Sequence, residues 1–225
     1  MHNFIKFIAA AAACLLMCSC SGGVTLDMLD KSYSTDSVNV NAQIPQISGL
    51  SDKDFQDSIN KDFRSASEEL LNSFSKSAKE TAELSEFNIQ TAEHYNKNGF
   101  VSVVEQIDYF SRKTHKNSCR VTKNINTEKC CEVSLGDLFE DDDYIDALNA
   151  LLENEIAANP DKYADLWQKP KVSQNQCFYA NSDSLVLYYP PYELSYYERG
   201  FVEIPVALSE LSGCFKEEYR NIFLD

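Results

Sequence analysis

The sequence of 225 residues is poor in the residue types that acid–base catalysis and nucleic-acid binding require. It contains 3 histidines, and its 20 Lys and Arg residues are outnumbered by 35 Asp and Glu residues, which gives a formal net charge of -15. Few histidines leave few groups that exchange protons near neutral pH. The negative charge opposes binding to phosphate backbones, so we exclude nucleic acid as a partner and expect a basic one.

Glycine, proline and long apolar runs are also scarce. The chain has 7 Gly and 6 Pro, with 44% hydrophobic and 24% charged residues, which is the composition of a globular protein rather than of a fibrous or disordered one. An N-terminal apolar run covers residues 7–17, and no run reaches the roughly 18 residues that a transmembrane helix needs. We therefore expect a globular protein without a permanent membrane span.

The N-terminus has the pattern of a secretory signal peptide. Lys6 precedes the apolar run, and small residues follow it: Ser19, Ser21, Gly22 and Gly23. As a helix, the run would span about 16 Å, which is about half of a hydrocarbon core. These features predict that residues 1–19 are removed during export.

A cysteine after a Leu-x-small pattern resembles the lipobox of bacterial lipoproteins. Cys20 follows the small residue Ser19, whereas the competing Cys18 follows the bulky Met17. We therefore expect lipid attachment at Cys20. Loss of residues 1–19, which contain one lysine, then leaves 206 residues with a net charge of -16. The N-terminal lipid would hold this protein at the cell envelope, in the periplasm or on the cell surface. The alternative is cleavage at the glycines that follow, without a lipid.

Five cysteines lie downstream of the predicted anchor, in a compartment where disulfides persist: Cys119, Cys130, Cys131, Cys177 and Cys214. This odd number leaves at least one unpaired in a monomer. Adjacent cysteines do not readily bridge each other, so pairs such as Cys119 with Cys130 and Cys177 with Cys214 are open alternatives. A zinc site needs paired ligands at Cys-x-x-Cys-like spacing, which His115 and these cysteines do not provide, so we predict no metal and no cofactor.

In the first half, the hydrophobic pattern predicts a tether, a strand and a long helix. Residues 20–37 are polar, which indicates a flexible tether. Residues 38–44 alternate apolar and polar as a strand does, until Pro45. Ser51 or Asp52 can cap the following amphipathic helix of about 30 residues. Its apolar positions recur every three or four residues: Phe55, Ile59, Phe63, Ala66, Leu70, Phe74 and Ala78.

A period of two then marks an antiparallel hairpin. Residues 87–93 and 101–109 alternate on either side of a turn at residues 96–99. Residues 119–125 continue the pattern as a third strand. The long helix is expected to pack on this sheet.

The second half begins with a capped turn at residues 133–139. The acidic run at residues 141–143 lies at the positive N-terminal end of an amphipathic helix, residues 144–158, and lacks the spacing and central Gly of a calcium loop. Pro205 indicates that the last strand is an edge strand or contains a bulge. Three strands and a short closing helix are expected at residues 177–180, 184–189, 201–206 and 208–211.

These elements predict an α+β fold in which antiparallel sheets pack against two main amphipathic helices. We place two small, intimately packed modules at residues 38–131 and 132–225. They follow the signal peptide, residues 1–19, and the tether, residues 20–37.

The second half resembles the C-terminal module shared by the extracytoplasmic regions of RsiV-type, lysozyme-sensing anti-sigma factors. The resemblance depends on Ser-Leu-Gly-Asp-Leu-Phe at residues 134–139 and on Tyr-Tyr-Pro-Pro-Tyr-Glu-Leu at residues 188–194. Further matching segments are residues 177–179, residues 184–187, Gly200 and residues 202–205. The first half resembles the companion module found ahead of the catalytic domain of PdaC-type polysaccharide deacetylases, through residues 44–50 and 59–60.

One departure limits this comparison. Arg-Lys-Thr at residues 112–114 precedes His115, where the family usually has a Gly-Gly-Ala-His-like turn. The chain also shows neither a cytoplasmic sigma-binding segment nor a downstream deacetylase domain, so we expect neither activity. The resemblance then implies a non-catalytic module that binds lysozyme or other cell-wall material such as peptidoglycan outside the membrane.

The candidate partner-binding residues are Tyr189, Tyr192, Glu193, Tyr196, Tyr197 and Glu198. Tyrosines supply large, stiff, amphipathic contact area and often act as interface anchors. The alternative is that Tyr192 and the Pro-Pro pair merely fold the chain back against the sheet. Charge agrees with the binding role, because a strongly acidic protein attracts a basic one such as lysozyme.

Two other classes of function stay open. A hydrolase would need two poised carboxylates, and Glu193 with Glu203 is a pair on paper, but acidic residues are so common here that coincidence explains it better. We expect no enzyme and no catalytic residue. A structural lipoprotein that scaffolds the envelope is the main alternative, ahead of an accessory of a hydrolase or deacetylase.

Overall fold

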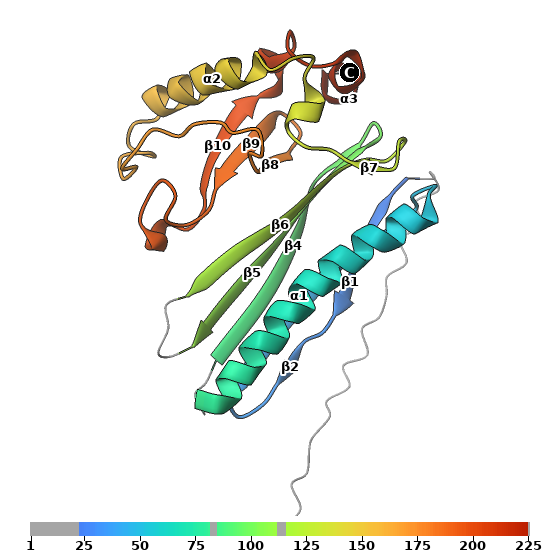
Figure 1. The fold of residues 1–225 in the computed structure, drawn as a ribbon, viewed down its shortest axis with the longest axis vertical. Coiled ribbons are helices and arrows are strands. Elements are labelled where there is room, and N and C mark those ends of the chain that lie inside the picture. Colours follow the sequence, from blue (N-terminus) through green and yellow to red (C-terminus); the bar gives the residue numbers. More distant parts are fainter. Residues whose placement is uncertain (1–22, 82–84, 112–115, 225) are drawn as a thin grey trace, which may run out of the picture.

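The computed structural model describes residues 23–81, 85–111 and 116–224. The predicted signal peptide, Cys20 and His115 lie outside these residues. The fold is α+β, as predicted, with two sheets and helices on their outer sides (Figure 1).

The larger sheet has the strand order β1-β3-β4-β5-β6-β7, with the short β2 also paired to β3. All neighbours are antiparallel except β3 and β4, which are parallel and joined through helix α1, Lys53–Thr81. A parallel pair needs such a crossover, which explains the position of the long helix. The strands are β1 Thr25–Asp30, β2 Tyr33–Ser34, β3 Val38–Ser48, β4 Ser85–Lys97, β5 Phe100–Ser111, β6 Asn117–Asn126 and β7 Cys131–Glu132.

The prediction of a flexible tether over residues 20–37 is wrong for residues 25–30 and 33–34, which form strands. Thr25 to Asp30 pair residue by residue with Ser48 to Gln43 of β3, and Tyr33 pairs with Val40. Three of the six residues of β1 are apolar, and the free edge of β3 supplies backbone partners along its whole length. Leu26 and Leu29 still pack against the core of this sheet.

Strand β3 continues past Pro45, where the sequence predicted its end. Its pairing with β4 stops at Ala42 and Ile89, so Pro45 lies beyond the part of β3 that pairs with β4. At Ile47, the side-chain amide of Asn60 from α1 replaces the missing strand. The Ile47 N–H donates to Asn60 Oδ1 at 2.7 Å, and Asn60 Nδ2 donates to the Ile47 carbonyl at 2.8 Å.

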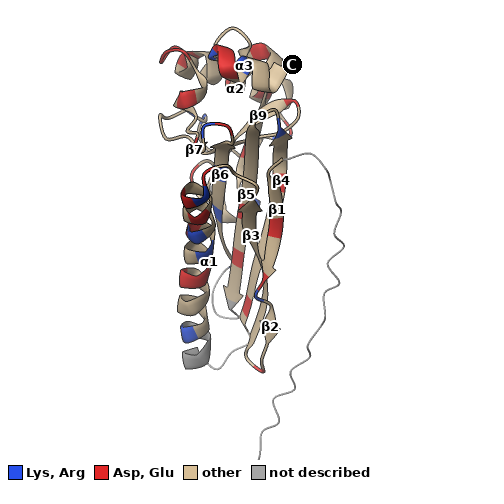
Figure 2. Ribbon diagram, turned by 90° about the vertical axis from the view of Figure 1, so that its right-hand side faces the viewer, with Lys and Arg blue, Asp and Glu red and all other residues tan. Residues whose placement is uncertain are grey.

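Helix α1 confirms the predicted amphipathic helix. The Phe55 N–H donates to the Asp52 carboxylate at 3.0 Å, so Asp52 caps its first turn. Its apolar stripe, including the buried Ile59 and Phe63, packs on one face of the larger sheet (Figure 2).

The predicted hairpin is confirmed as β4 and β5. Asn98 and Gly99 of its turn have positive φ, as a type I′ turn requires.

The C-terminal part contains a three-stranded sheet in the order β10-β9-β8, covered by helices. Among the described strands, β10 pairs with β9 alone, so Pro205 lies on an edge strand, which is one of the two alternatives that the sequence indicated. Its strands are β8 Phe178–Ala180, β9 Ser184–Tyr189 and β10 Val202–Ala207. Its helical segments are η1 Gly136–Leu138, α2 Tyr144–Ala158, η2 Tyr197–Arg199, η3 Leu208–Leu211 and α3 Glu217–Leu224, the last of which the sequence pattern did not predict.

The small sheet lies between the helices and the larger sheet. Alternate residues such as Leu187 and Ile204 point into the core beneath α2 and α3. Tyr179, Val186 and Tyr188 point the other way and pack against Val104 of β5. The layers are therefore α1, the larger sheet, the small sheet and the outer helices. The small sheet covers one end of the larger sheet and leaves its other end open (Figure 1).

The two modules also share a core. Phe100, from the end of the first hairpin, packs its ring against Phe223 of α3 at 5.0 Å between centroids. The Tyr95 hydroxyl donates to the carbonyl of Ile222 at 2.7 Å. The hairpin end thus belongs to the C-terminal core.

Candidate binding surface

Exposed aromatic side chains gather around the loop between β9 and β10. Tyr192 and Tyr196 are 63% and 65% exposed, and Trp167, from the loop after α2, is 48% exposed. The Trp167 and Tyr196 rings meet edge to face at 5.3 Å between centroids, and the Tyr192 and Tyr197 rings lie 5.0 Å apart. We call these four residues the aromatic surface.

Hydrogen bonds between the two loops hold this surface in place. The Trp167 backbone N–H donates to the Leu194 carbonyl at 3.1 Å. The Trp167 indole N–H and the Gln168 amide both donate to the Glu193 carbonyl, at 3.2 and 2.8 Å. Because Leu194 is buried, the loops are fixed to the core beneath them. Such fixed aromatic rings lose little conformational entropy when a partner binds.

Tyr192 has an unusual backbone. Its φ is 72°, in the left-handed region that residues other than glycine rarely adopt. The turn closes when the Glu193 N–H donates to the Pro190 carbonyl at 3.2 Å. Strained residues of this kind concentrate at functional sites. The Tyr192 side chain is 63% exposed, so its ring lies outside the core rather than against the sheet.

The six predicted binding residues divide into three groups. Tyr192, Glu193, Tyr196 and Glu198 are exposed, and Tyr197 is half-buried. Tyr189 does not belong to the surface, and its prediction is corrected: it is 1% exposed and its hydroxyl donates to the Lys171 carbonyl at 3.3 Å. The alternation of β9 directs its ring into the core beneath α2.

Trp167 is the residue that the sequence did not point to. It is the single tryptophan of the chain and follows α2 in a polar loop. Trp167 and Tyr196 are far apart in the sequence, so the sequence does not indicate that their rings are in contact. The one signal was the presence of a single tryptophan in a polar loop.

The aromatic surface belongs to the acidic part of the chain. Residues 132–225 contain 19 of the 35 acidic residues and 6 of the 20 basic ones, a net charge of -13. Acidic positions are frequent on α2 and α3 (Figure 2). Since almost the whole net charge lies in this part, it is the part that would attract a basic partner.

A cleft of about 520 Å³ separates the loop carrying η2 from the uncovered end of β5 and β6. We call it the inter-sheet cleft. Its lining residues are Gln106, Lys116, Ser118, Arg120, Tyr197, Glu198, Arg199, Gly200, Phe201 and Glu203.

Arg120 is the central residue of this cleft. Its Nη1 donates to Glu203 Oε1 at 2.5 Å, and its Nε donates to Gln106 Oε1 at 3.0 Å. The guanidinium also lies over the Phe201 ring, 4.1 Å from its centroid, and 5.3 Å from that of Tyr188. Arg120 thereby connects the two sheets.

The candidate hydrolase pair is not assembled at this cleft. Glu203 lines it and is bound to Arg120, whereas Glu193 lies on the exposed loop and is not part of the lining.

Between β4 and β8, the His94 and Tyr179 rings lie 4.1 Å apart. Burial lowers the pKa of His94 and raises that of Tyr179 to about 12, so both are uncharged at neutral pH.

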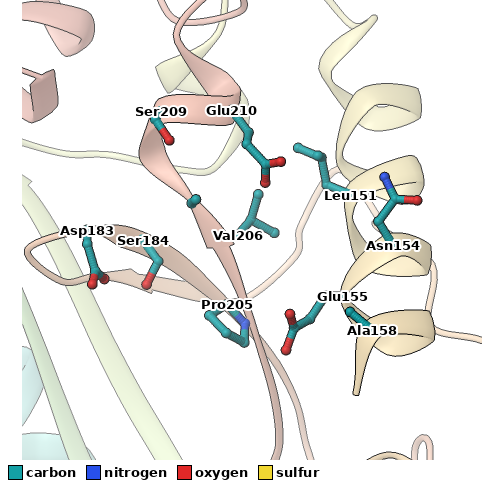
Figure 3. Close-up of a pocket in the computed structure, with 11 residues that line it drawn as sticks. Leu151, Asn154, Glu155, Ala158, Asp183, Ser184, Pro205, Val206, Ser209 and Glu210 are labelled. Atoms are coloured by element: carbon teal, nitrogen blue, oxygen red, sulfur yellow. The ribbon is translucent and has the colours of Figure 1, made fainter. Parts of the chain in front are cut away.

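A second hollow, of about 540 Å³, lies between α2 and the edge strand β10. Glu155 and Glu210 extend into the space between these elements, and Asp183 lies across the strand from them (Figure 3). Glu155 already has partners, since the Tyr163 hydroxyl donates to it at 3.1 Å and Lys162 lies 3.6 Å away.

Across residues 23–81, 85–111 and 116–224, no group of three or more His, Cys, Asp or Glu side chains is arranged to hold a metal ion.

All five cysteines within the described residues are free, so neither of the disulfides considered from the sequence is present. Cys119 packs against the core beneath α1, where burial raises the pKa of its thiol. Cys130, in the turn between β6 and β7, packs against the same core and has its Sγ 3.3 Å from the Ser51 hydroxyl, just before α1. In the same described part of the chain, no helix is both long and apolar enough to span a bilayer.

Comparisons with known proteins agree with this two-part architecture. A family model described as deacetylase PdaC matches residues 31–118, which confirms the resemblance of the first half. A second model, for a protein family of unknown function named DUF3298, matches residues 136–209. No curated protein matches the chain significantly.

Two crystal structures share the fold. A DUF3298 family member from Bacteroides fragilis aligns with a TM-score of 0.66 at 14% identity, covering 88% of this chain and 96% of that one. A DUF3298 family protein from Pseudomonas aeruginosa aligns with a TM-score of 0.56 at 16% identity, covering 87% and 93%. At these identities the likeness concerns the fold alone.

Proposed function

We propose that the protein is a non-catalytic envelope lipoprotein that binds a basic protein outside the membrane, with lysozyme as the first candidate. The observation that carries this proposal is the aromatic surface, an exposed cluster of rings fixed on the part of the chain with a net charge of -13. Aromatic anchors supply binding energy, and the acidic surroundings attract a basic partner and speed its association. The resemblance to lysozyme-sensing proteins supports the choice of lysozyme.

The predicted anchor suits this role. If Cys20 carries the lipid, four residues separate it from Thr25, the first residue of β1. A chain spans at most about 3.6 Å per residue, so this end of the larger sheet would stay within roughly 18 Å of the lipid attachment. The beginning of β1 and η2 lie on opposite sides of the molecule (Figure 1), so the aromatic surface would face away from the anchor.

Cell-wall material is the second candidate. The match of residues 31–118 to a family model described as a deacetylase supports it, because PdaC-type enzymes act on polysaccharides. A structural scaffold would bind neither lysozyme nor cell-wall material.

Titration separates these functions. The full-length protein in detergent is titrated with lysozyme and with soluble peptidoglycan fragments at moderate salt, beside the variants Trp167→Ala and Tyr196→Ala. Tyr33→Ala is the matched control, because Tyr33 is 44% exposed but lies on β2. We expect saturable lysozyme binding that either aromatic variant weakens at least about tenfold and the control leaves unchanged. Binding of fragments alone supports the wall-binding function, and no binding to either supports a scaffold.

The anchor has a separate test. Cells expressing the protein are labelled with a palmitate analogue, and Cys20→Ala is compared with Cys18→Ala. Cys20→Ala should abolish labelling of the membrane-bound protein, and Cys18→Ala should preserve it. Unchanged labelling of Cys20→Ala rejects lipid attachment at this residue.

A further inference from the structure

The inter-sheet cleft differs chemically from the aromatic surface. Each of its three basic lining residues is already paired with a carboxylate: Arg120 with Glu203 at 2.5 Å, Lys116 with Asp108 at 3.1 Å, and Arg199 with Asp165. An anionic ligand would therefore have to displace a carboxylate of the protein. The cleft presents polar groups whose charges are largely balanced.

The cleft is also longer than one cavity. A hollow of about 300 Å³ adjoins it through Lys116 and runs along the open end of β4 and β5. Asn88, Asp108 and the partly exposed Phe110 line this extension. The cleft itself, at about 520 Å³, is within the range of small-molecule sites. An elongated polar ligand would fit along both hollows.

We propose that the inter-sheet cleft binds a neutral, polyhydroxylated ligand, that is, a saccharide chain. Each hydroxyl group both donates and accepts hydrogen bonds, so it can use the remaining N–H groups of the arginines and the free lone pairs of the carboxylates without breaking an ion pair. Hydrogen bonds to charged groups are stronger than neutral ones. The C–H face of a sugar ring can also pack on an exposed aromatic ring such as Phe110, whose face is electronegative.

The walls of the cleft are held in position before any ligand arrives. Arg120 is fixed by Gln106, Glu203 and the Phe201 ring. Ser118 is on β6 like Arg120, and its hydroxyl donates to Asp108 of β5 at 2.5 Å. Gln106 Nε2, also on β5, lies 3.3 Å from both oxygens of the same carboxylate. This network aligns donors and acceptors along β5 and β6, so little ordering cost is left for binding.

The test uses calorimetric titration of the full-length protein in detergent with chitotetraose, a neutral oligomer of N-acetylglucosamine. Ser118→Trp fills the cleft, and Lys116→Ala removes a donor at the junction of the two hollows. Lys116 is exposed, so its loss should not affect folding. Ser209→Ala is the matched control, because Ser209 lines the separate hollow beside α2. Thermal melting verifies that each variant is folded.

We expect saturable binding with a Kd of about 1 mM or tighter, weakened at least about tenfold by Ser118→Trp and by Lys116→Ala and unchanged by Ser209→Ala. No binding, or binding that neither cleft variant weakens, overturns the proposal. Trp167→Ala separates this proposal from lysozyme binding, because it should weaken lysozyme binding at least about tenfold but leave chitotetraose binding intact. Loss of both ligands with Trp167→Ala would instead assign the saccharide to the aromatic surface.

Discussion

Glu105 gives the sharpest prediction, because it is a carboxyl group buried beneath α1. It lies on the helix-facing side of β5 and is 0% exposed. The Ser67 hydroxyl donates to its Oε1 at 2.6 Å, and its Oε2 has no hydrogen-bond partner among the described residues. Burial raises the pKa of Glu105 to about 7, because the ionised form loses its hydration.

The sign of the effect on stability follows from this pKa. In the unfolded chain the group has its ordinary pKa of 4.5. Between pH 4.5 and 7 the unfolded state releases the proton first, so the folded state loses stability as the pH rises through this range. This difference in pKa corresponds to roughly 3 kcal/mol, and the whole loss is present above about pH 7.

Glu105→Gln tests this reasoning, because glutamine keeps the shape of the side chain but does not ionise. The free energy of unfolding is measured by urea denaturation at pH 4.5, 6, 7 and 8, with circular dichroism as the signal. Relative to the wild type, the variant should gain about 3 kcal/mol of stability between pH 4.5 and 8. Other titrating groups cancel in this comparison.

Glu68→Gln is the matched control, since Glu68 follows Ser67 but is exposed on α1. Its difference from the wild type should stay within about 0.5 kcal/mol at every pH. A difference between wild type and Glu105→Gln that does not change with pH would refute the burial of an ionisable carboxyl group beneath α1.

Three further predictions follow from the same structure. Asn60→Ala removes both hydrogen bonds to the Ile47 backbone and should lower the free energy of unfolding by about 1–3 kcal/mol, whereas the exposed Asn72→Ala should change it little; urea denaturation measures both. Phe63→Ala leaves a cavity beneath α1 and should cost about 3–5 kcal/mol, and the half-buried Phe74→Ala clearly less; equal losses would contradict the assigned burial. Lysozyme affinity should fall at least about tenfold between 50 and 300 mM salt, mainly through slower association in stopped-flow measurements; an unchanged affinity would exclude electrostatic attraction.

Elements with local signals were predictable from the sequence. The apolar stripe of α1 and its Asp52 cap lie within a few residues of each other, and so do Asn98 and Gly99 in the hairpin turn. Elements that depend on distant partners were not. Strand β1 lacks a strict alternation of apolar and polar residues, and it pairs along the free edge of β3. Helix α3 has 8 residues, too few to be stable alone, and packs on the hairpin end.

In the candidate binding surface, too, residues with local sequence signals were predictable and contacts between distant residues were not. Local sequence identified the Tyr-rich loop and the exposure of Tyr196, but it left the exposure of Tyr192 open. It did not identify Trp167, because the contact of its ring with Tyr196 joins two separate loops. It also misplaced Tyr189, because the side of the sheet to which a strand residue points depends on what covers each face.

By itself, the sequence determined the α+β class, the long capped helix, the hairpins and the negative charge, because each depends on composition or on residues close along the chain. Only the tertiary structure decided that an N-terminal segment becomes a strand, that the hairpin end enters the C-terminal core, and that Arg120 meets Glu203 across two sheets. These contacts join residues that are distant in sequence, and their stability comes from burial and pairing that exist only after the chain has folded.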